Sequence, residues 1–474
     1  MIPEAVDVKM KTEQESFRDR VATIDGKGKR VWLFPKKPQG PLYNKRTALS
    51  IVYLVILFGL PFIKVDGHPL FLVNIIERKF ILFGQIFWPQ DFFIFAIGML
   101  LFIVFVALFT VVFGRVFCGW ICPQTIFMEM IFRKIEYWIE GDSSQQKLLA
   151  KAPWNTDKIL KKSGKWIAFW LLSFIIANTF LAYIIGIDEL GKIIREPVGK
   201  HIGGLTAILV FTSVFFLVYL RFREQVCTVV CPYGRLQGVL LDKKSIVVAY
   251  DYVRGEPRGK YKKNQPDDAG DCIDCMQCVK VCPTGIDIRN GTQLECINCT
   301  ACIDACNHMM QAVGKPVDLI RYASESSLEN KQPARFTTRM KAYSAVMLIL
   351  LGVEVFLLTT RTDVAVNILR TPGQLYQETI PGELSNLYNY KLLNKTYADK
   401  TVELRPENFQ GSVAIVGKEK LHIAKGSYIS GSLFISRKKS AVQQRKTDLK
   451  IGVYEAGKRI QTVNVTFLGP FTMN

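Results

Sequence analysis

Five long apolar stretches constrain what this chain can fold into more than any other feature of its sequence. Each is nearly free of charge and is close to the roughly 17–25 residues that a helix needs to cross the ~30 Å hydrocarbon core of a bilayer. One such stretch is compatible with a buried helix of a soluble protein, but five together predict a membrane protein. The predicted spans are Thr47–Ile63, Phe92–Phe113, Trp166–Ile187, Gly203–Leu220 and Ala342–Leu358.

Positive charge is distributed unevenly around these spans, and this predicts their orientation. Eleven Lys and Arg residues precede the first span, and nine lie between Arg115 and Lys165. Only three occur between the first two spans, and three between the third and fourth. Because basic loops remain in the cytoplasm, topology explains the net charge of +20, and nucleic-acid binding is not expected. The first 46 residues show no cleavable signal peptide, so a cytoplasmic N-terminus in a bacterial inner membrane is expected.

The sequence predicts a multi-domain α+β membrane protein. After Arg361 short β-type runs alternate with turn residues at intervals of roughly ten, which is typical of an all-β sandwich. Phe80–Trp88 is apolar but too short to cross the bilayer, so an interfacial or re-entrant segment is expected there. The β-type runs are Val364–Leu369, Leu387–Leu393, Ser412–Val416, Leu421–Ile423, Ser427–Ile435, Leu449–Tyr454 and Gln461–Phe467. The predicted domains are a basic cytoplasmic tail at 1–46, a four-helix membrane region at 47–240, a cytoplasmic cysteine-rich domain at 241–340, a fifth membrane helix at 341–360 and a periplasmic β domain at 361–474.

Eight of the twelve cysteines form two runs of the pattern Cys-x-x-Cys-x-x-Cys-x-x-x-Cys, in a segment expected in the cytoplasm, where disulfides are rare. In two-cluster ferredoxins, three cysteines of such a run bind one [4Fe-4S] cluster and the fourth binds the other. Zinc, the alternative metal for these runs, prefers two separated Cys-x-x-Cys pairs, so the spacing favours iron–sulfur clusters. Pro283 follows the first run as the motif requires, whereas Asn307 replaces the second proline. The pattern predicts a ferredoxin-like domain in which Cys272, Cys275, Cys278 and Cys306 hold cluster 1, and Cys296, Cys299, Cys302 and Cys282 hold cluster 2.

Two further cysteine pairs, Cys118/Cys122 and Cys227/Cys231, each follow a span and precede a proline. The spacing of four predicts that both sulfurs of a pair lie on one face of a helix, which the proline then interrupts or kinks. The sequences RVFCGWICPQ and REQVCTVVCPYG indicate that spans one and two recur as spans three and four. If the repeats pack face to face, four thiolates converge at the cytoplasmic edge of the bilayer. Soft sulfur ligands suit Cu(I), Zn or Fe–S, and four buried structural cysteines are the alternative.

Other ionisable residues give weaker indications. None of the four histidines lies in a span, so a b-type haem held by two histidines is not expected. His68 and His201 flank spans on the outer side, as an outer metal site or as ordinary loop residues. His308 is expected to pack beside the last cluster cysteine, and His422 to lie on a strand. Glu354 in span five is costly to bury and fits either proton or ion handling or a snorkelling position. No phosphate loop, Rossmann or flavin signature is present, so electrons are expected from quinol or a protein donor, and this donor stays unidentified.

The sequence resembles the FixG/RdxA/CcoG family of accessory proteins for assembly of cbb-type cytochrome c oxidase. The resemblance is carried by FCGWICPQ at 117–124, VCPYGRL at 230–236, AYDYVRGEPR at 249–258 and the double cluster motif. It implies an immunoglobulin-like C-terminal domain and a Cu(II)-to-Cu(I) reductase that supplies copper to the oxidase. Its implied partners are copper ions, oxidase assembly factors or a copper-transporting ATPase. It also implies that Cys118, Cys122, Cys227 and Cys231 are the catalytic, copper-handling residues.

Two other functions remain open on the sequence alone. The related Cys-x-x-x-Cys-Pro proteins of nitrate and nitrous oxide systems motivate a quinol-oxidising electron carrier of the NapH/NosR type. The external β domain motivates a non-catalytic scaffold that docks the assembling oxidase.

Overall fold

The computed structural model describes residues 22–24, 27, 29–65, 67–75, 78–261, 270–330, 337–380, 382–417 and 420–470. Most of the predicted N-terminal tail therefore lies outside the described residues. Contacts group the chain into two compact units. The first comprises Met1–Leu60, Ile97–Ala182 and Ile187–Leu351, and the second comprises Pro61–Ala96, Tyr183–Gly186 and Gly352–Asn474.

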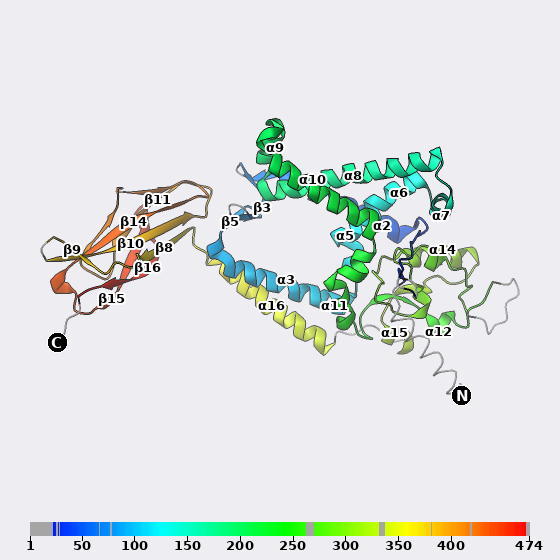
Figure 1. Cartoon of the computed structure of the whole chain (residues 1–474). Helices are drawn as coiled ribbons and strands as arrows, with labels where there is room; N and C mark the ends of the chain where they lie inside the picture. The colour runs from blue at the N-terminus through cyan, green and yellow to red at the C-terminus, as the bar shows by residue number, and fades with distance from the viewer. Residues whose placement is uncertain are drawn as a thin grey trace. The chain divides into compact units, whose positions relative to one another are not determined.

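The described residues contain five helices that are long and apolar enough to cross a membrane, as predicted. Their apolar side chains are largely exposed, for example Phe102 and Leu348 at 58% and 62%, which suits a lipid surrounding. Helix α8 begins at Thr156, well before Trp166, the predicted start of this span. Its first turns are polar, so hydropathy does not detect them, and its Lys165 pairs with Glu136. The spans are α2 (Pro41–Gly59) with η1 (Leu60–Phe62), α3 (Phe92–Phe113), α8 (Thr156–Ile185), α10 (Ile202–Leu217) with the π-helix η5 (Val218–Phe222), and α16 (Thr338–Thr359), all labelled or coloured in Figure 1.

Short helices connect these spans in the first unit. After α3 the order is a short helix, a break at Cys122-Pro123 and a new helix, and after α10 the same order ends in α11. The predicted sequence repeat therefore corresponds to a repeat of elements. The connecting helices are α4 (Val116–Trp120), α5 (Pro123–Thr125), the π-helix η3 (Ile126–Phe132), α6 (Arg133–Glu140), α7 (Ser143–Lys151), α9 (Ile187–Arg195), η4 (Val198–Lys200), the π-helix η6 (Val226–Val230) and α11 (Pro232–Leu240).

The ferredoxin-like part of the first unit is small and rich in loops. One antiparallel strand pair, β6 (Val247–Tyr250) with β7 (Ile320–Ala323), brackets both cysteine runs. Its core combines cysteines with Val248, Ile288, Ile303 and Met310. The helices are α12 (Tyr252–Gly255), α13 (Gln277–Lys280), η7 (Ile288–Asn290), α14 (Ala301–Ala312) and α15 (Glu325–Asn330).

The β-sandwich of the second unit confirms the predicted all-β domain and is the orange-to-red part of Figure 1. One sheet has the order β12-β14-β10-β8 with β9 on β10, and the other has the order β13-β11-β15-β16. Alternate apolar residues fill the space between them, including Leu392, Val402 and Phe467. The strands are β8 (Val364–Arg370), β9 (Gln377–Ile380), β10 (Glu383–Asn394), β11 (Lys400–Pro406), β12 (Ser412–Ile415), β13 (Leu421–Ile423), β14 (Tyr428–Lys438), β15 (Lys446–Glu455) and β16 (Lys458–Leu468), with η8 (Lys439–Ala441) before β15.

The segment Phe80–Trp88, predicted as an interfacial or re-entrant piece, forms a hairpin of a three-stranded sheet whose Ile81 and Ile86 are almost completely buried. Half-buried or exposed residues flank each of these two isoleucines, as in a half-buried strand, which explains the apolar content of the segment. Within the second unit Asp91, just after this sheet, pairs with Arg361 at 2.8 Å and Lys395 at 2.5 Å. The elements are β1 (Lys64–Val65), β2 (His68–Pro69), β3 (Phe71–Asn74), β4 (Lys79–Leu82), β5 (Gln85–Phe87) and η2 (Pro89–Asp91).

Candidate metal centres

The first cysteine cavity is lined by residues of both cysteine runs. Cys272 and Cys275 lie in the loop before α13, and Cys278 lies on α13 itself. Cys306, on α14, completes the wall. The cysteine set is the one that the spacing predicts for cluster 1, although the ligation itself stays a prediction.

The second cavity is lined by the complementary set, Cys282, Cys296, Cys299 and Cys302, together with Cys278. In each run the second and fourth residues after the first cysteine have a left-handed backbone: Asp274 and Met276 in one, Asn298 and Thr300 in the other. Such φ values are uncommon outside glycine and cluster at functional sites. Here they turn the chain tightly so that successive cysteines face one cavity.

The chemistry of these cysteines fits a metal–sulfur group. Burial raises the pKa of Cys278 and Cys296 to about 12 and that of Cys299 to about 11. A thiolate in such surroundings requires a cation, and metal binding supplies it with release of the proton. Within the described ranges no three Cys, His, Asp or Glu side chains converge closely enough to hold one single ion. Each cavity is lined by the four cysteines of one predicted set, the number of ligands that a [4Fe-4S] cluster requires.

Asn307, which stands in place of the second motif proline, lets α14 continue to Ala312. Its side-chain amide donates to Asp318 Oδ1 at 3.0 Å and its Oδ1 accepts from the Asp318 amide at 2.8 Å. A proline here would remove a helical hydrogen bond. The substitution therefore leaves all four cysteines of the second run in place and extends the helix that carries Cys306.

The membrane cysteines gather from two distant segments. Cys118 lies on α4 and Cys227 on η6, and burial raises the pKa of these thiols to about 11 and about 12. Negative charge on Cys122 or Cys231 would raise the pKa of both thiols further, so all four sulfurs are within electrostatic reach of one another. Cys118 Sγ also lies 3.3 Å from Gln237 Oε1.

The expectation that both sulfurs of a pair share one helix is wrong. Helix α4 ends before Cys122, and Cys122 and Cys231 are the N-caps of α5 and α11 with extended ψ values of 125° and 112°. Both residues precede a proline, and clash with its ring drives the preceding residue out of the helical region. The proline then occupies the first helical turn, where its missing N–H costs nothing.

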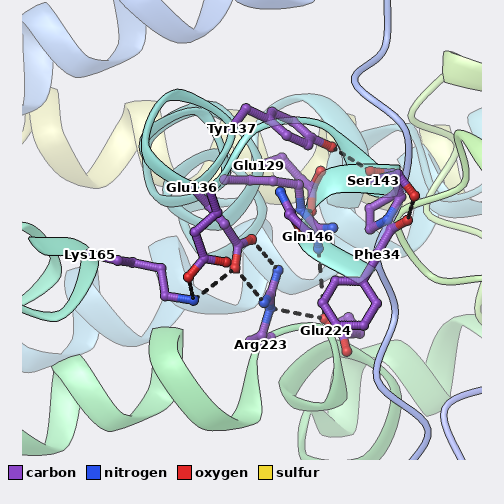
Figure 2. A network of polar contacts seen from close by, with 12 residues as sticks. Phe34, Glu129, Glu136, Tyr137, Ser143, Gln146, Lys165, Arg223 and Glu224 are labelled. Carbon is purple, nitrogen blue, oxygen red and sulfur yellow. Dashed lines mark hydrogen bonds and ion pairs between the residues drawn. The ribbon is translucent and has the colours of Figure 1, made fainter. Parts of the chain in front are cut away.

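A network of buried charges links the segment just before Cys227 to α6 and α8. Glu136 accepts two hydrogen bonds from Arg223, at 3.0 and 2.8 Å, and lies 3.3 Å from Lys165. Figure 2 shows Glu136 between these two cations, with Glu224 on the far side of Arg223. Burial alone would raise the pKa of Glu136, but these cations hold it down at about 2. Sequence analysis missed this network, whose only local signal is the charged Arg-Glu pair just before Cys227.

An N-terminal segment adds to the same region of the first unit. The Trp32 ring lies 4.1 Å from the Arg30 guanidinium and 5.6 Å from that of Arg223. The Lys36 amide donates to the Lys280 carbonyl at 2.7 Å, while Tyr137 donates to the Pro35 carbonyl at 3.1 Å. The segment thus bonds both the ferredoxin-like part and α6, and Figure 2 shows Tyr137 beside it.

The remaining predicted site residues have ordinary surroundings. His68 stacks on Tyr397 at 4.3 Å, His201 Nε2 lies 3.0 Å from Glu196, and His422 lies 3.3 Å from Thr401. His308 lies on α14. Glu354 Oε2 accepts no hydrogen bond from the part of the chain that the structure describes.

Three family models match this chain. A 4Fe-4S dicluster domain matches residues 222–325, which include Cys227, Cys231 and both cysteine runs. A 4Fe-4S binding domain matches residues 95–142 around Cys118 and Cys122. An immunoglobulin-like fold at the C-terminus of FixG matches residues 355–470.

Three curated proteins are similar over most of their length. Protein RdxA of Cereibacter sphaeroides is 33% identical over 90% of this chain and 94% of its own. The nitrogen fixation protein FixG of Rhizobium meliloti is 32% identical over 80% of both chains. Protein RdxB of Cereibacter sphaeroides is 31% identical over 91% of this chain and 95% of its own.

Proposed function

Because the chain belongs to the FixG family of membrane iron–sulfur electron-transfer proteins, we propose that it reduces Cu(II) to Cu(I) for assembly of a cbb-type cytochrome c oxidase. The observation that carries the proposal is the gathering of Cys118, Cys122, Cys227 and Cys231 beside a domain with two cysteine cavities. We further propose that the ferredoxin-like domain is cytoplasmic and the β-sandwich periplasmic, as the charge distribution predicts.

The two cysteine cavities are the electron store of this proposal. Cys272, Cys275, Cys278 and Cys306 would hold one [4Fe-4S] cluster, and Cys282, Cys296, Cys299 and Cys302 the other. Clusters of this type, when bound, exchange one electron at a time. The chain's part is to ligate them, exclude water with residues such as Ile288 and Met310, and fix their distance from the acceptor.

The membrane cysteines are the proposed acceptor site for copper as substrate. Thiolates select Cu(I) over harder cations, so four of them favour the cuprous product once an electron arrives. Because burial raises the pKa of Cys118 and Cys227, copper must displace their protons. Copper binding is therefore expected to strengthen as pH rises.

The test mixes anaerobically purified, prereduced protein with Cu(II) and follows cluster reoxidation in the visible spectrum. Wild-type protein is expected to reoxidise with formation of one Cu(I) per electron lost, measured with a cuprous chelator. Loss of an outer-shell partner alone typically costs 10–100-fold at a metal site, so Cys118→Ser with Cys231→Ser is expected to slow the reaction about tenfold or more. Thr228→Ala, in η6 between Cys227 and Cys231, is the matched control. An unchanged rate in the double variant would remove these cysteines from the mechanism.

The other two functions are outcomes of related measurements. Quinol-dependent reduction of the clusters with copper inert would favour a carrier of the NapH/NosR type. Oxidase assembly that requires the β-sandwich but tolerates loss of both cysteine runs would favour a scaffold. A chain that lacks residues 361–474 and still supports assembly would count against the scaffold.

A further inference from the structure

The first membrane motif packs directly on the loop that begins the second cysteine run. Cys118 contacts the small buried cluster that contains Ile297 and Cys299, and Trp120 Nε1 donates to the Asn298 carbonyl at 3.2 Å. A Cβ on Gly119 would lie 2.3 Å from the Ile297 carbonyl oxygen. The two backbones therefore touch at a point that only glycine permits.

The second membrane motif reaches the same loop. Helix α11 starts directly after Cys231, and a Cβ on its Gly238 would lie 2.5 Å from Leu294 Cδ2. The neighbouring Gln237 is the residue whose Oε1 lies 3.3 Å from Cys118 Sγ. Both halves of the repeat thus converge on residues 294–299.

The other cysteine cavity has different neighbours. Besides its cysteines it is lined by residues such as Tyr250, Met276, Arg289 and Leu319, whereas the membrane motifs pack on residues 294–299. Cys299, which Cys118 approaches, lines the cavity of Cys282, Cys296 and Cys302 instead. The two cavities are therefore not equivalent with respect to the membrane cysteines.

Two buried arginines lie at the contact between the membrane motifs and residues 294–299. Arg115 and Arg46 are only 5% and 2% exposed, and the hydrogen bonds that they donate go to the carbonyls of Leu294 and Gly119. Arg115 Nε and Arg46 Nη2 find no partner within the described residues. A buried cation needs an anion nearby.

Arg46 donates to the carbonyl of Gly119, next to Cys118, and Arg115 donates to the carbonyl of Leu294, two residues before Cys296. The two guanidinium groups therefore place fixed positive charge at the contact between the first membrane motif and the second cysteine run.

We propose that residues 294–299 form the electron-transfer junction between the ferredoxin-like domain and the membrane cysteines, with Gly119 as a positioning residue and Arg46 and Arg115 as its fixed positive charge. Cys282, Cys296, Cys299 and Cys302 would hold the cluster that supplies one electron and is thereby oxidised, and this electron would reduce one Cu(II) to Cu(I). No bond or proton is exchanged across the junction. A low-potential one-electron donor refills the junction through the Cys272 cavity. The identification of copper as the electron acceptor rests on the proposed function. The difference between the two clusters in their contact with the membrane cysteines does not.

The first test measures reduction potentials by EPR-monitored titration without copper. Removing a positive charge disfavours the reduced state of a nearby cluster, so Arg115→Gln is expected to lower the midpoint potential of one cluster signal. Arg115→Lys, which keeps the charge, is expected to leave it unchanged. Arg289→Gln, at the other cavity, is expected to shift the other signal. If the Arg115→Gln protein does not bind iron, the same titration is made with Arg46→Gln, which is expected to lower the midpoint potential of the same cluster signal.

Two results would overturn the junction on this measurement: a charge-removing variant that shifts neither signal, or one that shifts the same signal as Arg289→Gln. A merely structural role for the arginines would not move one potential selectively.

The second test measures the rate of Cu(II)-driven reoxidation in Gly119→Ala against Gly164→Ala, a helical glycine with nothing within 4 Å of its added Cβ. With both cluster signals intact, the first is expected to lose about tenfold or more in rate, as misplacements of about 1 Å can do, and the second nothing. A wild-type rate in Gly119→Ala would overturn the junction while the proposed function stands. If wild-type protein is itself inert to Cu(II), the proposed function fails and the potentials alone decide the junction.

Discussion

The two groups of cysteines in this molecule are assembled in opposite ways. The eight cysteines from Cys272 to Cys306 reach their cavities through short loops and two helices, so their arrangement is largely local. The four membrane cysteines come from segments about a hundred residues apart. They meet only because helices and a buried charge network hold those segments together. Local spacing builds the two cysteine cavities, and tertiary packing builds the proposed acceptor site.

The largest expected effect separates the two groups by iron content. Cys299→Ser removes a ligand of one predicted cluster, so purified protein is expected to lose about half of its iron and one EPR signal. Cys231→Ser is expected to leave the iron content unchanged. Iron and sulfide analysis of both variants checks this. A loss of iron in Cys231→Ser would show that the membrane cysteines also hold a cluster, as the 4Fe-4S binding domain matched around Cys118 allows, and would contradict separate roles for the two groups of cysteines.

The next effect tests how far the acceptor depends on distant charges. Glu136→Gln leaves Arg223 and Lys165 buried without their shared carboxylate, which is expected to cost about 3–5 kcal/mol of unfolding free energy. Thermal or denaturant unfolding in detergent measures it. The exposed pair of Glu189 with Lys192 provides the control, because Glu189→Gln is expected to cost at most about 1 kcal/mol. Equal losses in the two variants would contradict a buried, supporting network.

The same carboxylate makes a pH prediction. The pKa of Glu136 is about 2 in the folded protein, below its ordinary value of 4.5. Its contribution to stability is therefore complete above about pH 5 and is lost as pH falls toward 2. The stability difference between wild type and Glu136→Gln is expected to shrink over that window. A difference that stays constant from pH 6 to pH 3, by unfolding at each pH, would contradict the ion pairing.

The smallest effect concerns the N-terminal segment. Trp32→Ala removes the ring beside Arg30 and Arg223, and is expected to cost about 1 kcal/mol with iron content unchanged. Trp32→Phe keeps a ring face and is expected to recover part of the loss. Unfolding of the two variants distinguishes them. A loss of clusters in Trp32→Ala would mean that this segment supports the electron store rather than the acceptor.

Much of the fold was predictable because its signals are local. Hydropathy located all five spans, and spacing sorted the eight cysteines into the sets that the structure places around two cavities. β11 was not predicted, although Val402 and Leu404 alternate there with polar residues. Phe80–Trp88 was predicted only as an interfacial or re-entrant piece, and the structure adds that it is a hairpin whose tight turn has positive φ values at Phe83 and Gly84.

The rest of the site was not predictable from local pattern. The partner of Glu136 lies 87 residues away, and that of Gly119 lies in the ferredoxin-like part of the first unit. Proline chemistry could have corrected one error, since a residue before proline leaves the helical region. That rule places Cys122 and Cys231 at helix starts rather than on the helices that precede them.

The most direct measurement of the central claim is iron and sulfide analysis, with EPR, of the full chain purified without oxygen. Two [4Fe-4S] clusters per chain, with two distinct EPR signals after reduction, are the predicted result. A colourless protein without iron would contradict the electron-transfer role that both cysteine cavities are proposed to serve.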